Sequence, residues 1–189
     1  MGHYKNNVTL LLLVFLAIIS SKVDANFDIA LENTDGNAFS IAEYIGTGKW
    51  VVLNIWGPRC PPCREEMPEL VRFHDEHISK NTMVLAIAID FPSYGYAKRD
   101  EVAQFEEDYL IDFPVLLSDA SITEKMNLGR LKGLPTTFIF NPEGELAGKQ
   151  VGGITQKILE DFIKKLKLQA PGSEQNQKSG DNQTKTRKK

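Results

Sequence analysis

Cysteine is scarce in this sequence, with only two in 189 residues. Both lie in one short stretch, as Cys60 and Cys63, so a disulfide between them closes almost no loop and would stabilise the fold little. A scaffold stapled by several cysteine pairs is thereby excluded. No second pair exists to complete the four ligands of a closed zinc site. Cys60 and Cys63 are predicted to exchange electrons, with carriage of copper(I) or another metal as the alternative.

Histidine is also scarce, with three in the chain. His74 and His77 follow Cys63 by over ten residues on the same predicted helix, too far for a metal site shared with the cysteines of one chain. We expect His74 to be half-buried on the core face and His77 to lie on the surface. Met67 could be a third soft ligand for copper(I), but its place on the apolar helical face favours core packing. No bound cofactor or metal is predicted.

The sequence has little excess of charge of either sign, with 22 Lys and Arg against 25 Asp and Glu. The basic residues are scattered rather than gathered on one face, so nucleic-acid binding is not predicted. The length and the 42% of hydrophobic residues suit one core, which we place in residues 26–168. Residues 169–189 lack any large apolar side chain and are expected to form a disordered polar and basic tail.

No run reaches the roughly 20 apolar residues that a transmembrane helix needs. The most apolar stretch, residues 8–19, would extend about 18 Å as a helix, against the roughly 30 Å of a bilayer core. A weakly positive start precedes it, and small residues up to Ala25 offer a cleavage site. Residues 1–25 are therefore predicted to be a signal peptide, with an uncleaved anchor as the alternative. The protein is expected to be exported, to the periplasm or another extracytoplasmic compartment.

Between these ends, strand patterns alternate with helix patterns. Residues 49–56 and 82–90 are continuous apolar runs typical of buried strands. Further strands are expected in "FPVLLSD", "TTFIF" and "LAGKQVGG". Helices are expected from Cys60 to about Ser79, from Asp100 to Tyr109, from Ser118 or Asp119 to about Leu128, and from Thr155, with Ile158, Leu159, Phe162 and Leu166 on one face.

The N-terminal part of the domain predicts a β-hairpin. Apolar residues alternate on both sides of Asp35 and Gly36, a pair that tolerates positive φ in a tight turn. Ser40 could then cap a short helical turn through Tyr44. Together the pattern predicts an α/β fold, with a central mixed sheet flanked by helices and antiparallel edges.

The two cysteines are expected at the start of the helix that follows the central strand. With Cys60 at the N-cap, Pro61 and Pro62 occupy the first turn, where the missing N–H groups cost nothing. The Cys60 sulfur then faces the positive end of the helix dipole, which favours the thiolate. Cys60 is the predicted nucleophile and Cys63 the resolving thiol. Arg59 would favour the thiolate further if its side chain turns toward the sulfur.

A second feature stands about seventy residues later in the chain, in "GRLKGLPTTFIF". Pro135 comes just before a predicted strand, where a proline cannot join the ladder and where cis X-Pro bonds are often found. An ordinary loop proline would explain it equally well. Pro135 supports the prediction of redox chemistry only in combination with the Cys-x-x-Cys motif.

Taken in order, "WGPRCPPCREEMPEL", "FPVLLSD" and "GLPTTFIFNPEGEL" resemble the exported thioredoxin-like thiol:disulfide reductases of the TlpA and ResA type, over residues 27–168. The resemblance implies a thioredoxin fold with an added N-terminal hairpin and a central insert. It further implies reduction of disulfides in exported proteins, notably apocytochromes c, with electrons drawn from a membrane thiol reductant exporter. We expect a monomer that acts on protein disulfides or thiols.

The resemblance also assigns roles to single residues. Cys60 becomes the attacking thiol, Cys63 the resolving thiol and Pro135 a cis-proline beside them. Leu134, followed by Pro135 and Thr136, offers its backbone to an extended substrate segment, as in β-augmentation. Trp56 stands where the family keeps an aromatic residue under the active site, although plain core packing would explain it equally well.

Glu66 is the expected proton acceptor that activates Cys63. Thioredoxins proper carry a buried acid where this chain has Asn54, which cannot accept a proton, and Glu66 matches the glutamate of the ResA-like pattern three residues after the second cysteine. The alternative is that Glu65 and Glu66 only complement the helix N-terminus.

The chain departs from the family at two places. Arg59 replaces a common tryptophan, and "GLPTT" differs from the loop of dedicated cytochrome-maturation members, so the apocytochrome substrate is a family-level expectation. Two rival functions remain open: a disulfide-donating oxidase of the same fold, and a module that binds copper(I) or thiol-containing clients.

Overall fold

The computed structural model describes residues 25–169. The predicted signal peptide, up to residue 24, and the predicted tail, from residue 170, lie outside the described residues. Within residues 25–169, no helix is both long enough and apolar enough to cross a membrane.

An eight-stranded mixed sheet forms the centre of the molecule, as predicted. Its order is β2-β1-β6-β4-β3-β7-β8, with β5 paired to β4 off this path. The strands are β1 (Ala30–Glu32), β2 (Ala38–Ser40), β3 (Trp50–Trp56), β4 (Thr82–Asp90), β5 (Gly95–Tyr96), β6 (Val115–Leu117), β7 (Thr136–Phe140) and β8 (Leu146–Val151).

The central pair explains the two continuous apolar runs of the sequence. β3 and β4 run parallel, β7 lies antiparallel on the other side of β3, and every residue of β3 is buried. A strand covered on both faces has no solvent side, so it needs no polar alternation. Both runs are strands, as expected.

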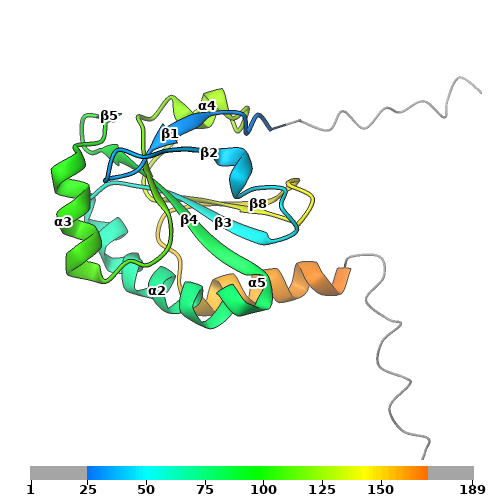
Figure 1. Ribbon diagram of the computed structural model, residues 1–189. Coiled ribbons are helices and arrows are strands. Elements are labelled where there is room, and N and C mark those ends of the chain that lie inside the picture. The colour runs from blue at the N-terminus through cyan, green and yellow to red at the C-terminus, as the bar shows by residue number, and fades with distance from the viewer. Residues whose placement is uncertain (1–24, 170–189) are drawn as a thin grey trace, which may run out of the picture.

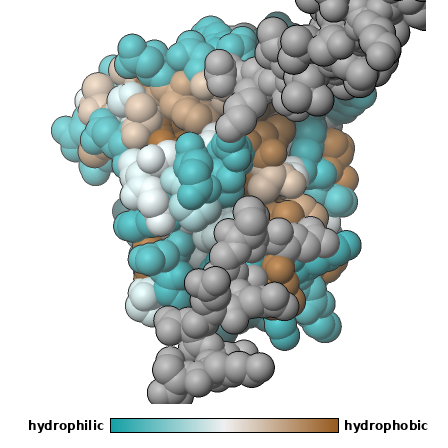
Figure 2. All heavy atoms as spheres, turned by 90° about the vertical axis from the view of Figure 1, so that its right-hand side faces the viewer, coloured by the Kyte–Doolittle hydropathy of each residue, from teal (hydrophilic) through white to brown (hydrophobic). Residues whose placement is uncertain are grey.

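Helices cover the two faces of the sheet (Figure 1). The helices are α2 (Pro61–His77), α3 (Arg99–Tyr109), α4 (Ile122–Lys125) and α5 (Gln156–Gln169), with 3-10 turns η1 (Ile41–Glu43) and η2 (Ile78–Lys80). One buried cluster, here called the α2-face cluster, lies between the sheet and α2, α3 and α5. The other, the α4-face cluster, lies between the sheet and η1 and α4. Polar and apolar side chains are mixed on the outer side shown in Figure 2, so the long apolar runs of the sequence lie between the layers.

The N-terminal hairpin is confirmed. β1 and β2 pair antiparallel around a turn in which Gly36 has a φ of 87°, a conformation that favours glycine. Ser40 caps η1 through a capping box with Glu43.

Three details of the predicted elements are wrong. The helix expected up to Leu128 is the short α4, because the chain turns left-handed at Asn127, where φ is 57°. The N-cap of α4 is Ser121 rather than Ser118 or Asp119. Asp119 accepts a hydrogen bond from the Ser121 N–H. The segment between residue 90 and Asp100, for which the sequence predicts no strand or helix, contains β5, whose two residues are too few for a periodic signal. Ile158 is 53% exposed, whereas Leu159 and Ile163 form the buried face of α5.

Candidate active site

Cys60 and Cys63 form a disulfide at the start of α2, with a Cα–Cα distance of 5.3 Å. Cys60 is the N-cap, in an extended conformation with φ −86° and ψ 112°, and Pro61 and Pro62 occupy the first two helical positions. This is the placement that the sequence predicts. Both cysteines are buried, Cys60 at 1% exposure and Cys63 at 0%. The disulfide therefore forms part of the α2-face cluster.

Gly57 allows the chain to leave β3 toward the disulfide. A Cβ at this position would stand 2.8 Å from the Ile89 carbonyl oxygen and 3.1 Å from the Phe91 Cβ. Any larger residue would push the active-site loop away from the end of β4. The Gly57 carbonyl in turn accepts a hydrogen bond from the Cys60 N–H, at 3.0 Å.

Arg59 does not supply a cation to the Cys60 sulfur. Its guanidinium donates to the Asp90 carboxylate and lies 3.2 Å, from Nε to Oε2, from Glu101. A hydrogen bond from Ser93 and the ion pair with Arg59 lower the pKa of Asp90, which keeps that partner ionised. The sequence does not predict the direction of the Arg59 side chain. In the structure it points toward Asp90 at the end of β4 and Glu101 on α3.

Glu66 is buried on α2, one turn after Cys63, with 3% exposure. Its Oε1 accepts a hydrogen bond from Asn54 Nδ2 at 2.8 Å, and its Oε2 accepts one from the Ile154 N–H at 2.9 Å. Burial raises the pKa of Glu66 to about 7, although these two hydrogen bonds act in the opposite direction. An exposed first-turn carboxylate that only complements the helix N-terminus would have neither property.

Asn54 links Glu66 to the sheet. Its side chain is buried on β3, and Nδ2 also lies 3.1 Å from Thr137 Oγ1 on the neighbouring β7. Its Oδ1 has no hydrogen-bond partner among the described residues. Asn54 therefore cannot take a proton, but it holds one oxygen of the carboxyl group that can.

The Leu134–Pro135 peptide bond is cis, as expected. β7 pairs with β3 through Ile55 and Thr136, which brings Pro135 to the end of β3 from which the cysteine loop departs. The loop is tied at both sides, because the Gly152 N–H donates to the Pro135 carbonyl at 2.8 Å and Thr136 Oγ1 donates to the Gly133 carbonyl at 2.7 Å. A second cis bond, Phe91–Pro92, had no distinctive sequence signal.

Trp56 is fully buried in the α2-face cluster, which also contains both cysteines. Its ring packs against Phe105 of α3, with centroids 4.6 Å apart. Its Nε1 has no hydrogen-bond partner among the described residues. The aromatic residue expected beneath the disulfide thus also fastens α3 to the active site.

His74 and His77 lie away from the disulfide, and the predictions for both are corrected. His74 is buried more deeply than expected, at 5% exposure, and its Nδ1 accepts a hydrogen bond from the Val84 N–H at 3.0 Å. His77 is partly buried rather than on the surface, because its ring stacks on Phe73. It ends α2, about 26 Å along the helix axis from Cys60. Met67 is fully buried in the α2-face cluster.

The sequence and the fold of the chain are similar to those of known proteins. The sequence matches the AhpC/TSA family over residues 23–149. The chain belongs to the AhpC/TSA family. It is 31% identical over 151 residues to the thiol-disulfide oxidoreductase ResA of Bacillus subtilis, covering 79% of this chain and 77% of that protein. It is 28% identical over 143 residues to ResA of Halalkalibacterium halodurans, with 76% of each covered.

Solved structures share the fold of this AhpC/TSA family member. A thiol:disulfide interchange protein of the thioredoxin family from Chlorobium tepidum superposes with a TM-score of 0.63 at 24% identity, covering 75% of this chain and 94% of that one. A secreted thiol-disulfide isomerase from Corynebacterium glutamicum gives 0.62 at 25% identity, covering 71% and 80%. The thioredoxin-like fold is confirmed, and the Cys60–Cys63 pair within it makes the chain a thiol-disulfide oxidoreductase.

Several site residues escaped sequence reasoning. Asp90 and Glu101 form ion pairs with Arg59. Thr137 contacts Asn54, and the Ile154 N–H donates to Glu66. These contacts join positions 31 to 88 residues apart in the chain. No local pattern marks such contacts, and only the sheet topology brings them together.

Proposed function

We propose that this oxidoreductase works as an exported reductase of protein disulfides. The Cys60 thiolate attacks one sulfur of a substrate disulfide, that S–S bond breaks, and a mixed disulfide forms. The Cys63 thiolate then attacks the Cys60 sulfur, which releases the substrate as a dithiol and restores the Cys60–Cys63 disulfide. The substrate gains two electrons and the protein loses two, so a separate dithiol must reduce the pair before the next cycle.

The observation that carries the reducing direction is that Arg59, the residue next to Cys60, is paired with two carboxylates. A dithiol oxidase is a strong oxidant because its reduced form is stabilised, chiefly through its thiolate. Here Arg59 is held by Asp90 and Glu101, and Cys60 itself is 1% exposed. Burial disfavours the thiolate, and the paired Arg59 adds nothing to the stabilisation that the helix N-terminus provides, which supports a reducing pair.

Glu66 takes the proton of Cys63 when the mixed disulfide is resolved. Residues three apart on a helix are neighbours on its surface, and both side chains are buried. With its pKa raised to about 7, the carboxyl group exchanges protons readily near neutral pH, which is the range in which a general base is most effective. Asn54 and the Ile154 N–H hold the two oxygens in place.

An extended segment of the substrate lies along the cis-proline loop. Leu134, Pro135 and Thr136 lie at the end of β7 that adjoins the cysteine loop. The Leu134 backbone then pairs with the substrate as a short added strand, which requires no particular side chain. Trp56 and Arg59 shape the same region, Trp56 from beneath and Arg59 from the α3 side.

The partners follow from the family resemblance. The predicted signal in residues 1–25 exports a monomer that needs no bound cofactor, and a membrane thiol reductant exporter supplies its electrons. Exported proteins with disulfides are the substrates, and an apocytochrome c with a Cys-x-x-Cys disulfide is one candidate. The similarity to the thiol-disulfide oxidoreductases named ResA supports this class of reaction for the chain.

The direction is tested by running the same exchange both ways. Reduced protein is mixed with disulfide-linked peptides, and oxidised protein with the corresponding dithiols, with mixed disulfides trapped by acid and identified by mass. The proposal expects fast reduction and slow oxidation, with the trapped peptide on Cys60. Faster oxidation would make the chain a disulfide donor, and a peptide trapped mainly on Cys63 would reverse the two cysteine roles.

A further inference from the structure

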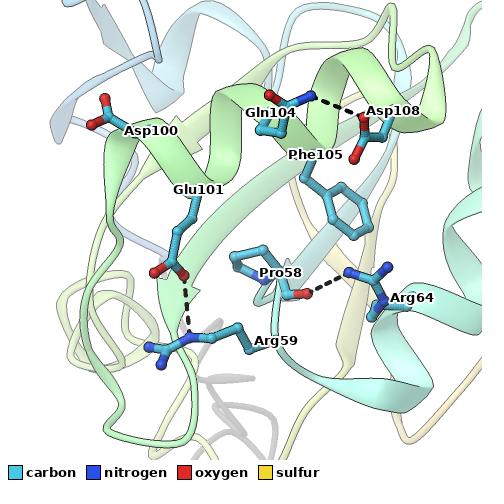
Figure 3. A pocket seen from close by; sticks show the side chains of 8 residues that line it. All are labelled: Pro58, Arg59, Arg64, Asp100, Glu101, Gln104, Phe105 and Asp108. Atoms are coloured by element: carbon cyan, nitrogen blue, oxygen red, sulfur yellow. Dashed lines mark hydrogen bonds and ion pairs between the residues drawn. The ribbon is translucent and has the colours of Figure 1, made fainter.

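A groove of about 430 Å³ opens between the cysteine loop and α3. Figure 3 shows Pro58, Arg59 and Arg64 on the side of the disulfide and Phe105 between the two walls. The opposite wall is the outer face of α3, formed by Asp100, Glu101, Gln104 and Asp108. Arg59 directly precedes Cys60, so anything bound covalently to Cys60 starts beside this groove.

The two arginines of the groove are already occupied. Arg59 is paired with Asp90 and Glu101. Arg64 donates to the Pro58 carbonyl at 3.1 Å, and its guanidinium stands 5.4 Å from the ring centre of Phe105. Arg59 is thus neutralised by carboxylates, whereas Arg64, on the cysteine-loop side opposite the carboxylates of α3, contacts a carbonyl and an aromatic ring.

Two carboxylates of the opposite wall have no such cation. Asp100 has no hydrogen-bond or ion-pair partner within residues 25–169, and Asp108 accepts only a neutral hydrogen bond from Gln104, at 2.9 Å. The helical spacing of four residues puts Asp100, Gln104 and Asp108 in one row. The α3 wall therefore carries uncompensated negative charge along its length.

We propose that this groove selects substrates that carry a lysine or arginine close to the cysteine under attack. The statement rests on the proposed disulfide exchange at Cys60 and adds a substrate preference to it. One side of the substrate segment follows Pro135, and the other enters the groove, where its basic side chain meets Asp100 or Asp108.

The reach of the wall sets the position of that basic residue. The row from Asp100 to Asp108 extends about 12 Å along the helix, and an extended peptide covers roughly 3.3 Å per residue. Arg59, the residue before Cys60, reaches Glu101 of this wall at 3.2 Å from Nε to Oε2, so a cation about two to four residues from the cysteine under attack can lie against the carboxylates. A segment with an acidic residue there meets the same wall with repulsion.

The test compares short symmetric disulfide-linked peptides that differ at one position, about three residues before or after the cysteine, where Lys, Gln or Glu is placed. The reduced full-length protein is mixed with excess peptide, and the second-order rate constant of the single turnover that oxidises Cys60 and Cys63 is measured for each peptide at low and high salt. We expect one of the two Lys positions to exceed its Gln counterpart by about fivefold at low salt, with the ratio approaching one at about 0.5 M salt.

Asp100→Asn with Asp108→Asn should bring this ratio close to one, because the amides keep the shape and lose the charge. The matched control is Glu107→Gln with Glu143→Gln, which removes the same net charge from exposed positions outside the groove lining and should keep the ratio. Equal rates for Lys, Gln and Glu peptides in the unaltered protein would overturn the groove assignment while leaving the reductase intact. The groove assignment would also be overturned if both double variants lost the Lys to Gln preference to the same extent.

Failure of the proposed function looks different. If the protein reduces none of the peptides but oxidises their dithiols, the proposed reducing direction is wrong. The ratio of the oxidation rates of the Lys and Gln peptides then tests whether the groove prefers basic substrates. The mixed disulfide with Cys60 is shared by both directions, so the same preference is expected. A ratio of one there overturns the groove assignment as well.

Discussion

The two faces of the sheet are built from alternate residues of the same strands, yet they bury different chemistry. The α4-face cluster takes Val51, Leu53 and Ile55 from β3, and Thr123, the buried polar residue of α4, carries no ionisable group. The α2-face cluster takes Val52 and Trp56 and adds the disulfide. The two ionisable side chains among the buried residues, Glu66 and His74, both belong to α2.

The α4 face therefore contributes to the stability of the fold, whereas the α2 face also holds the groups that carry out redox and proton chemistry. A well-packed apolar face holds the strands in register without any protonation change. The other face can then place a disulfide, a carboxyl group of raised pKa and an unpartnered indole N–H in one interior. Changes on one face should alter the free energy of unfolding alone, whereas changes on the other should also alter redox or proton chemistry.

The largest effects are expected at the cysteines of the α2 face. Cys60→Ser should abolish disulfide exchange, because the attacking sulfur is gone. Cys63→Ser should still attack a substrate and should accumulate the mixed disulfide, because nothing displaces the product. Mass spectrometry after acid trapping distinguishes them. Accumulation in Cys60→Ser and not in Cys63→Ser would assign the roles the other way round.

On the α4 face, Phe138→Ala should cost about 3 to 5 kcal/mol in the free energy of unfolding, since Phe138 is fully buried and leaves a cavity. The reduction potential of the folded variant should stay that of the unaltered protein. Denaturant unfolding and a redox titration measure the two quantities. A clear change of potential would show that the faces are not separable.

Glu66→Gln should slow resolution of the mixed disulfide about a hundredfold or more, from the lower end of what general-base catalysis contributes. The rate should also lose its dependence on pH around 7, where Glu66 titrates. Stopped-flow measurement of product release checks this, with Glu65→Gln, an exposed neighbour, as the control. A Glu66→Gln protein that keeps both the rate and its pH dependence would remove Glu66 from the mechanism.

The same carboxyl group should give stability a distinct pH dependence. The pKa of Glu66 is 4.5 as its ordinary value and about 7 when folded, so the folded state binds more protons between these values. The free energy of unfolding should therefore fall as pH rises from about 4.5 to 7, by at most about 1.4 kcal/mol per pH unit. Urea unfolding across this window measures the slope, which should be absent in Glu66→Gln.

His74 should contribute a smaller slope of opposite sign. Burial lowers the pKa of His74 below its ordinary value of 6.5, so the unfolded state binds the extra proton. Its contribution is complete above pH 6.5 and is lost as pH falls below that value. Comparing His74→Gln with the unaltered protein isolates this part, and an identical acid limb in both would contradict it.

Sequence reasoning reached the parts of the molecule that depend on neighbours in the chain. The apolar runs of β3 and β4, the hairpin turn at Gly36 and the proline-marked start of α2 are all local signals. The short α4 was overestimated because the left-handed turn at Asn127 carries no glycine to announce it.

The parts that escaped depend on contacts across the fold. The direction of Arg59 is set by Asp90 and Glu101 on other elements. The two hydrogen bonds of Glu66 come from β3 and from the residue Ile154, 88 positions away. The chemical identity of the pair could thus be predicted, but the surroundings that tune it could not.

The most direct test of the account is the equilibrium reduction potential of the Cys60–Cys63 pair, titrated against dithiothreitol and glutathione buffers. Burial of Cys60 and neutralisation of Arg59 predict a value below about −220 mV, in the range of reducing thioredoxins. A value close to about −120 mV would mean that the reduced pair is strongly stabilised and donates disulfides, which would contradict the proposed direction.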